Sequence, residues 1–459
     1  MNLILRQVRP FGGALTDMAI RDGLIVAQAD GRGFVEYDGD GATLLPGLHD
    51  HHLHIAALGA RRASLDLAPC IDGEEVVKAV AAFAAQHPLG SWLRAVGYDE
   101  RAAGLPDASD LDRWCPDHAM RLQDRTGALW VLNRRALAVL GDAPRPPGCE
   151  RDGEGRPTGR FWREDAWLGA HVPRQAIDFA ALGRDLAALG VTGLTDAGAT
   201  NGPAMAHTLG EAHLAGALPQ HLVLMGSERL GEGAGYRRGP LKLLIDERAP
   251  PGVDALAGRI VAARAAGRSV AAHCVTLIEL LLYLAALDTA GGARCGDRIE
   301  HGGVIPAALI DRIAAMGLIV ATNPVFIADR GDRYRAEIPA AEWPDLYRAA
   351  SLIDAGVALV AGSDAPYGQV DPWAGMRAAT SRRAASGASL SPQERVSADR
   401  ALALYWGHGE APDRQRRLAV GEPADLILLR GGYRDVLADL SADRVMATII
   451  GGKPVHIAH

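Results

Sequence analysis

Short apolar runs separated by helical stretches recur along the second half of the chain, and this rhythm constrains the fold more than any other feature. From residue 190 onward there are seven such runs, at 191–198, 220–227, 241–246, 269–274, 297–301, 318–323 and 358–364. Alanine- and leucine-rich helical sequence fills the intervals, which is typical of parallel strands that alternate with helices. The segment TLLPGLHDHHLH, over 43–54, supplies one more run. Eight strands predict an α/β protein built on a (β/α)8 TIM barrel.

The first two predicted barrel strands are separated by far more chain than one helix needs. About 135 residues lie between them, and we expect a large insertion over about 66–175, close to the mouth of the barrel. Strand-like segments also occur at both chain ends, over 1–45 and 405–459. Because both ends of a barrel chain lie at its surface, we expect these segments to form one small β-sandwich domain, with the barrel over 46–404.

Composition and charge exclude several functional classes. The formal charge of −7, with no basic run, argues against nucleic-acid binding. Five cysteines, an odd number without a CxxC pair, indicate reduced thiols. No apolar run is long enough to span a membrane, and the first residues do not resemble a signal peptide. We expect a cytoplasmic enzyme with a small-molecule substrate, and a homo-oligomer is a reasonable expectation.

Ionisable side chains lie at the ends of several predicted strands: His52, His54, Lys242, His273, His301 and Asp364. In a TIM barrel the active site lies at the C-terminal ends of the strands, so these side chains are expected to meet there. Burying so many ionisable groups without partners would cost several kcal/mol each. A pair of divalent cations removes this difficulty, and nitrogen and oxygen ligands suit zinc.

The run HDHHLH, over 49–54, contains two pairs of histidines spaced two residues apart. Residues i and i+2 of a strand face the same side, so the pairs 49/51 and 52/54 are expected on opposite faces. The distance from the preceding Pro-Gly turn favours His52 and His54 as the metal ligands. The other pair is then expected to be structural, and Asp50 to orient a ligand from behind.

Lys242 needs a chemical explanation, because an ammonium group cannot bind a metal. Reaction of the amine with carbon dioxide would give a carbamate, whose two oxygens can bridge two cations. The alternative for Lys242 is a solvated surface lysine. Asp364 is the candidate general base, beside a metal-bound water whose pKa falls from 15.7 to about 7. On its own, an aspartate that follows Gly-Ser could instead cap a helix.

Several motifs resemble the amidohydrolase superfamily, and within it the metal-dependent hydrolases of amidohydrolase family 3, which include N-substituted formamide deformylases. PGLHDHHLH resembles the first-strand motif of that group, GPLKLLIDE its lysine strand, and AAHC and DRIEHG its fifth and sixth strands. AGSDAPYGQVDPW resembles its last strand and VGEPADLILL its return into the β domain. GYDERAAGLP, LQDRTGALWVLNRRAL and DGEGRPTGRFWRED resemble parts of its insertion. The resemblance implies that the six strand-end residues are metal ligands.

Two departures from the group leave the substrate open. The triplet over 125–127 is Arg-Thr-Gly where the group has Asp-Gly-His, and Glu247 stands where the group has glycine. Five residues are candidates for substrate contact: Tyr98, Arg125, Trp130, Asn323 and Tyr367. For the first three, ordinary packing or solvation is an equal alternative.

We predict a metal-dependent hydrolase of a C–N bond, in an amide, N-formyl or N-acyl group, that uses a metal-bridging hydroxide and Asp364 as general base. A mononuclear deaminase of a heterocyclic base is the second hypothesis. Such enzymes carry a glutamate three residues after the fifth-strand histidine, where this chain has Thr276. A non-catalytic barrel homologue is the third, and relatives of that kind lose ligands that this chain retains. Iron, manganese or cobalt are alternatives to zinc.

Overall fold

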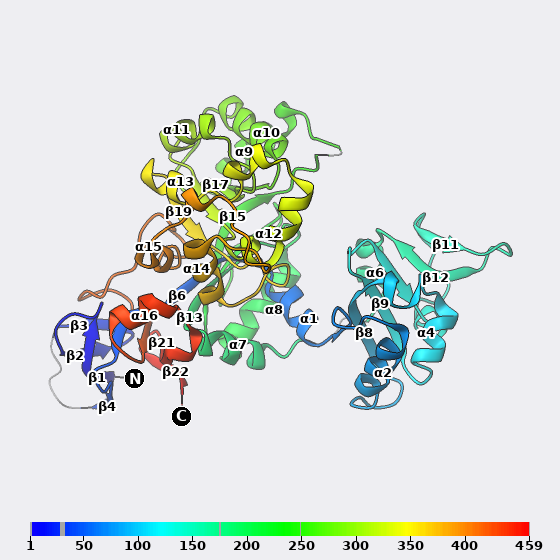
Figure 1. Cartoon of the computed structure of the whole chain (residues 1–459), viewed down its shortest axis with the longest axis horizontal. Helices are drawn as coiled ribbons and strands as arrows, with labels where there is room; N and C mark the ends of the chain where they lie inside the picture. The colour runs from blue at the N-terminus through cyan, green and yellow to red at the C-terminus, as the bar shows by residue number, and fades with distance from the viewer. Residues whose placement is uncertain (1, 28–32, 174–175, 248, 459) are drawn as a thin grey trace. The chain divides into compact units, whose positions relative to one another are not determined.

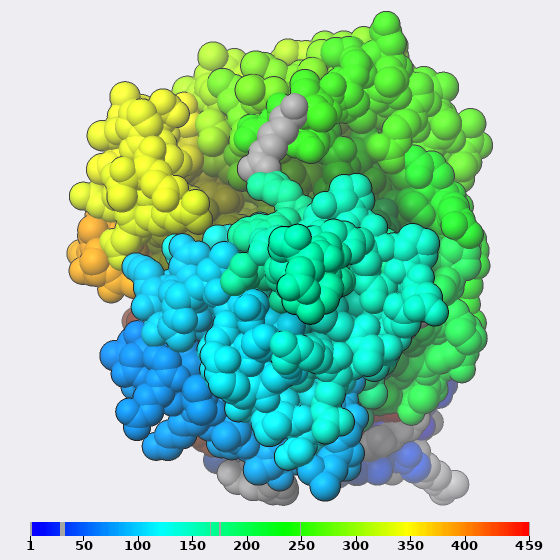
Figure 2. Space-filling model, turned by 90° about the vertical axis from the view of Figure 1, so that its right-hand side faces the viewer, coloured from blue at the N-terminus to red at the C-terminus, as the bar shows by residue number. Residues whose placement is uncertain are grey.

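The computed structural model describes residues 2–27, 33–173, 176–247 and 249–458. The chain divides into two compact units, one of Met1–Ile55 with Phe179–His459 and the other of Ala56–Asp178. Figure 1 colours the chain from blue at the N-terminus to red at the C-terminus, and Figure 2 shows the surface of the second unit. The first unit is therefore completed only after the chain has passed through the whole of the second.

Eight parallel strands form the central sheet of the first unit, in the order β19-β18-β17-β16-β15-β14-β13-β6. In chain order they are β6 (Leu48–Leu53), β13 (Val191–Asp196), β14 (His221–Gly226), β15 (Arg237–Leu243), β16 (Val270–Cys274), β17 (Arg298–His301), β18 (Ile319–Thr322) and β19 (Ala358–Ala361). Backbone hydrogen bonds connect the two outer strands, from Asp364 N to His52 O at 2.7 Å and from His54 N to Ala365 O at 2.8 Å. The sheet is nearly closed, and the predicted TIM barrel is confirmed.

Helices follow most of the barrel strands and cover the sheet. They are α7 (Phe179–Ala188), α8 (Pro203–Leu214), α9 (Val253–Ala265), α10 (Leu277–Thr289), α11 (Ala307–Ala315), α12 (Val325–Glu337), α13 (Ala350–Asp354), α14 (Pro372–Ser381) and α15 (Ala398–Ala403), with 3-10 turns at Ala340–Asp345 and Pro392–Glu394. The largest apolar cluster lies between β15–β18 and the helices α9–α11, and Leu284 and Ile299 are fully buried in it. Burial on both faces explains why β16 and β18 consist mostly of apolar residues.

Both chain ends contribute to a second sheet in the first unit, in the order β22-β21-β20-β5-β1-β2-β3, with β4 also paired to β1. Its strands are β1 (Asn2–Pro10), β2 (Thr16–Arg21), β3 (Leu24–Val26), β4 (Phe34–Asp38), β5 (Thr43–Pro46), β20 (Leu426–Leu429), β21 (Val445–Ile450) and β22 (Lys453–Ile457), with α16 (Tyr433–Asp439) and a 3-10 turn at Ala442–Arg444 between β20 and β21. Its core contains Leu5, Leu44 and Leu428. The predicted pairing of the two chain ends in a β assembly is confirmed.

The run at 43–54, which was predicted to supply one barrel strand, is divided between the two sheets. Thr43–Pro46 forms β5, which pairs with β20 and β1 rather than with the barrel. Gly47 N donates to Asp425 O at 2.8 Å, whereas Leu48 N donates to Gly190 O at 3.0 Å. The backbone therefore changes partner at Gly47, where a Cβ would lie 2.3 Å from the Thr192 side chain.

The second unit is built on a six-stranded sheet, in the order β11-β12-β10-β9-β8-β7. Its strands are β7 (Leu65–Asp66), β8 (Trp92–Tyr98), β9 (Ala119–Asp124), β10 (Leu129–Leu132), β11 (Cys149–Arg151) and β12 (Pro157–Trp162); its helices are α1 (Ile55–Arg62), α2 (Gly73–Ala84), α3 (Glu100–Ala103), α4 (Ala108–Trp114), α5 (Arg134–Val139) and α6 (Asp165–His171). Two apolar clusters give this large insertion a core of its own. Among the helices of the described residues, none is both long and apolar enough to cross a membrane.

Candidate metal centre

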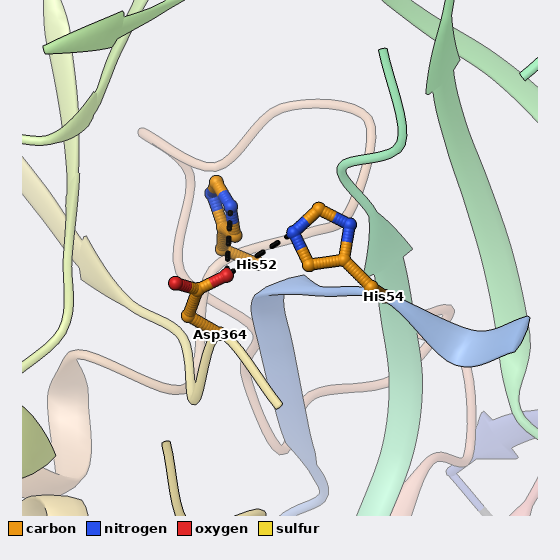
Figure 3. A group of neighbouring side chains, drawn as sticks. All are labelled: His52, His54 and Asp364. Atoms are coloured by element: carbon orange, nitrogen blue, oxygen red, sulfur yellow. Dashed lines mark ion pairs between the residues drawn. The ribbon is translucent and has the colours of Figure 1, made fainter. Parts of the chain in front are cut away.

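Three side chains meet where the first and last barrel strands end (Figure 3). Asp364 Oδ1 lies 3.2 Å from His54 Nε2 and 3.5 Å from His52 Nε2. One possible ligand atom from each of the three residues lies within 4.8 Å of the others. Imidazole nitrogen and carboxylate oxygen at this separation are suitable ligands for a single divalent ion.

The remaining predicted ligands lie around these three. The His301 ring centroid is 4.5 Å from that of His52, and the His273 centroid is 4.6 Å from that of His301. Lys242 Nζ lies 4.0 Å from Glu300 Oε2, and Glu300 in turn contacts the His52 ring. Side chains from five strand ends therefore converge as the sequence predicted, and their role as metal ligands stays a prediction.

Glu300 is a site residue that the sequence prediction missed. Its carboxylate accepts hydrogen bonds from Arg298 Nε at 2.7 Å and from His52 Nδ1. Because a carboxylate only accepts, His52 Nδ1 must carry the proton, which leaves the Nε2 lone pair directed toward Asp364. Carboxylates commonly orient metal-binding histidines in this way. The one available signal was a glutamate directly before His301 in a predicted barrel strand.

Strand alternation explains why Glu300 was missed. Adjacent residues of a regular strand face opposite sides, so Glu300 and His301 were not expected in the same site. Glu300 pairs in register with His273 and so shares its face. His301 has a φ of +69°, in the left-handed region that non-glycine residues seldom adopt, and this turns its ring into the same site. Asp364, with a φ of +53°, is in the same uncommon region.

A second polar contact orients His301. Its Nδ1 lies 2.8 Å from Asn323 Oδ1, while Asn323 Nδ2 donates to Gly362 O at 2.9 Å. The amide oxygen can only accept, so His301 Nδ1 carries a proton and Nε2 remains available as a ligand atom. Asn323 is fully buried. The structure shows it positioning His301, and its contact with a substrate stays a prediction.

Asp50 holds the junction between β6 and the end of β19. It accepts hydrogen bonds from His52 N at 3.1 Å, from Ser363 N at 3.0 Å and from Ser363 Oγ at 2.6 Å. These bonds fix the backbone next to both His52 and Asp364. Burial raises the pKa of the Asp50 carboxyl to about 6, although the three hydrogen bonds oppose that rise.

Burial determines the protonation states at the site. Burial is the main cause that holds the pKa values of His52 and His301 well below the ordinary value for histidine. Burial, together with the charge of Lys242, lowers the pKa of His273 to about 4. Burial also lowers the pKa of Lys242. Burial acts to raise the pKa of the Asp364 carboxyl, but its close contact with His54, together with His301 and Lys242, outweighs burial and lowers that pKa. Neutral imidazoles beside a carboxylate are the forms that bind metal.

One further observation fits a metal at this position. Lys242 Nζ is buried and, among the residues that the structure describes, has no hydrogen-bond partner. A buried amine without a hydrogen-bond partner is costly, whereas a carbamate at the same position would be an anionic ligand. The donor set of imidazoles, a carboxylate and this lysine therefore fits divalent metal ions.

The other histidine pair, His49 and His51, lies away from this cluster, with ring centroids 4.4 Å apart. His49 Nε2 lies 2.8 Å from Thr195 Oγ1. The pairing of β6 with β13 contains two register shifts, so strict alternation does not hold along this strand. The pair 52/54 is nevertheless the one beside Asp364, as predicted.

The three substrate candidates of the insertion make contacts within their own unit. Tyr98 is buried and its hydroxyl donates to Gly104 O at 2.7 Å. Trp130 is also buried, and its Nε1 donates to Asp165 Oδ1 at 2.8 Å. Arg125 is exposed and pairs with Asp99 at 3.2 Å. These contacts correspond to ordinary packing and surface pairing, which was the alternative given for each of the three residues. A contact between these residues and a substrate stays a prediction.

Tyr367 lies next to the candidate ligands. Its ring centroid is 5.6 Å from that of His54, with the rings nearly perpendicular, and 61% of the residue is exposed. An exposed aromatic ring at the edge of the site is suitable for substrate contact. That role also stays a prediction.

Thr276, where a deaminase would carry its acid/base glutamate, begins a helix. Its side chain accepts a hydrogen bond from Glu279 N, and the Glu279 carboxylate accepts from Thr276 N at 3.0 Å. This reciprocal capping box accounts for both residues at the start of α10.

Comparison with known proteins agrees with this geometry. The sequence model of the amidohydrolase family matches residues 35–456. The chain belongs to the amidohydrolase family. This amidohydrolase is 26% identical to the YtcJ protein of Bacillus subtilis (strain 168), over 91% of the chain and 89% of that protein. It is also 26% identical to the N-substituted formamide deformylase of Arthrobacter pascens, over 90% of the chain and 88% of the relative.

The fold of this amidohydrolase is also similar to a solved structure. The crystal structure of an uncharacterized metal-dependent hydrolase from Pyrococcus horikoshii OT3 superposes with a TM-score of 0.77 at 18% identity, covering 95% of this chain and 99% of the other. The predicted family is therefore confirmed, and with it a hydrolase of the metal-dependent amidohydrolase type.

Proposed function

We propose that this amidohydrolase cleaves a C–N bond in an amide, N-formyl or N-acyl group. The observation that supports it best is the convergence of His52, His54 and Asp364 with three further ionisable strand-end residues. The name of the deformylase relative, which acts on N-substituted formamides, supports the choice of bond.

Residues of this chain would supply the binding and the proton transfer. His52, His54, His273, His301, Asp364 and a carbamate on Lys242 would hold two divalent ions, most suitably zinc. Such ions polarise a substrate carbonyl and lower the pKa of a water molecule. Asp364, whose pKa is lowered, is ionised at neutral pH and accepts the proton of the attacking water. It then delivers that proton to the leaving nitrogen, so that water and amide become a carboxylic acid and an amine.

The neighbours of these residues hold them in a reactive geometry. Glu300 and Asn323 fix the ring nitrogens of His52 and His301, and Asp50 fixes the backbone on both sides of the β6–β19 junction. A site held in this way loses little entropy when the substrate arrives.

The test is a hydrolysis assay on a panel of N-formyl, N-acetyl and longer N-acyl amines, with the metal content measured on the same preparation. We expect release of amine from at least one class, loss of release after chelation, and recovery when zinc is returned. Asp364→Asn should lose nearly all activity, whereas Asp371→Asn, which changes a helix cap outside the site, should retain it. No turnover with the metal-loaded protein on any class would contradict the proposal.

Metal stoichiometry separates the proposal from the deaminase alternative. Two ions per chain are expected for a binuclear hydrolase and one for a mononuclear deaminase. Ammonia release from aminated heterocycles, with one ion per chain, would favour the deaminase. A chain that binds no metal under saturating zinc would favour the non-catalytic homologue.

A further inference from the structure

A polar cavity lies at the opposite ends of the barrel strands from the metal centre. It has a volume of about 380 Å³, and His49 and His221, at the starts of β6 and β14, line it together with the loop over 408–417. A cavity of this size falls within the range of small-molecule sites. No residue of the candidate metal centre lines it.

Positive side chains dominate the lining. Four arginines contribute to it: Arg237, Arg414, Arg416 and Arg417. Two of the three carboxylates that line it are already paired, Glu410 with Arg237 at 3.6 Å and Asp425 with His221 at 2.9 Å. The lining therefore holds four arginines against three carboxylates, and among the described residues Arg414, Arg416 and Arg417 have no carboxylate within ion-pair distance.

Arg416 is the most buried of these cations, and its contacts are with neutral groups. Its guanidinium donates to Gly47 O at 3.0 Å, to Thr192 Oγ1 at 2.6 Å and to His49 Nδ1 at 3.3 Å. Within the described parts of the chain it forms no ion pair with a carboxylate. Arg416 is partly buried, and the charge of Asp425 acts on it only from beyond ion-pair distance. Partial loss of hydration without a direct counter-charge is unfavourable for a guanidinium.

The protonation of His49 follows from the same contact. A guanidinium can only donate, so His49 Nδ1 accepts and its Nε2–H donates to Thr195 Oγ1. His49 is therefore neutral, and burial, with the charges of His51 and Arg416, keeps its pKa well below the ordinary value. It stabilises Arg416 by a hydrogen bond but does not neutralise it.

We infer that this cavity binds a small dianion whose negative oxygens pair with Arg416 and with the exposed Arg414 and Arg417. Guanidinium groups are suited to this because their paired N–H donors match the oxygens of carboxylate and tetrahedral oxyanions. The ligand would give Arg416 the direct contact with an anionic oxygen that no described carboxylate provides. This inference is independent of the proposed C–N hydrolysis, since it uses none of the metal-site residues.

Isothermal titration calorimetry of the full chain tests the inference with two probes, succinate for carboxylates and sulfate for tetrahedral oxyanions. We expect saturable binding of at least one probe at one site per chain. The double variant Arg414→Ala/Arg417→Ala should weaken that binding at least about tenfold, equivalent to about 1.4 kcal/mol. Because both side chains are exposed, this variant should fold normally.

The matched control is Arg229→Ala/Arg434→Ala, which removes two exposed arginines that do not line the cavity. Its affinity should stay within about twofold of the wild-type value, so that an effect of net charge is distinguished from an effect of the site. Binding of succinate alone assigns a dicarboxylate ligand, and binding of sulfate alone assigns a tetrahedral oxyanion. The absence of saturable binding of both probes, or an equal loss in both double variants, overturns the inference.

Discussion

Replacement of Glu300 by glutamine tests how the metal centre is held. The side chain of Glu300 is fully buried and pairs with Arg298, which is 1% exposed, at 2.7 Å. Glutamine keeps the volume but loses the charge, and breaking a buried ion pair costs about 3–5 kcal/mol of stability. Loss of a carboxylate behind a metal-binding histidine typically lowers metal affinity about 10–100-fold, or roughly 1.4–2.7 kcal/mol. We expect both effects for Glu300→Gln.

Glu394→Gln is the matched control for this experiment. Glu394 is also a buried carboxylate, paired with Arg348 at 2.8 Å and bonded to Ala349 N at 3.0 Å, and none of these contacts involves the metal centre. Both variants should lose similar stability in thermal unfolding. Equilibrium dialysis against buffered zinc, with elemental analysis of the bound metal, should show weaker binding for Glu300→Gln and unchanged binding for Glu394→Gln.

One result would refute this reasoning. If Glu300→Gln is as destabilised as Glu394→Gln but binds zinc with wild-type affinity, the Glu300–His52 contact does not orient a metal ligand. Glu300 would then only neutralise Arg298 within the barrel.

Three further predictions follow from single contacts. The hydrogen bond and charge of His221, together with the charge of Arg416, hold the pKa of Asp425 below its ordinary value in spite of burial. The stabilisation that the ionised Asp425 provides is therefore complete above about pH 4 and is lost as pH falls through the lower folded pKa. The melting temperature of Asp425→Asn should change less between pH 5 and 3 than that of the wild type, and an equal slope would exclude this linkage. Leu284→Ala, at a fully buried position, should lower the free energy of unfolding in urea by about 2–5 kcal/mol. Leu281→Ala, at a position that is 43% exposed, should lower it by about 0.5 kcal/mol or less. Similar losses in both variants would mean that α10 is not packed as described. If Lys242 forms a carbamate, added bicarbonate should raise the metal content of the wild type after chelation and reloading, but not that of Lys242→Met. A rise in both proteins would argue against the carbamate.

The barrel could be predicted from local sequence because a buried parallel strand must be apolar on both faces. The run at 191–198 became Val191–Asp196, and the run at 358–364 became Ala358–Ala361 followed by Asp364. Strand order in a TIM barrel then places the polar side chains that end the strands at one rim. The convergence of the ionisable strand-end residues was predictable for this reason.

Backbone departures from regular strands were not predictable in the same way. Alternation placed Glu300 and His301 on opposite faces, but the φ of +69° at His301 brings both into the site. The change of sheet at Gly47 divided the run at 43–54, because Thr43–Pro46 pairs with β20 and β1 and only the part after Gly47 enters the barrel. Both features depend on partners distant in the sequence.

The sequence by itself determined the barrel, the pairing of the chain ends and the strand-end residues that gather at one rim, since periodicity reports which faces must be buried. Only the tertiary structure decided which polar groups orient them, such as Glu300 and Asn323, and that Arg416 lies partly buried with no carboxylate of the described residues in direct contact. These contacts depend on register and backbone geometry between strands far apart in the chain. Local sequence patterns do not encode that geometry, because each strand is compatible with several neighbours.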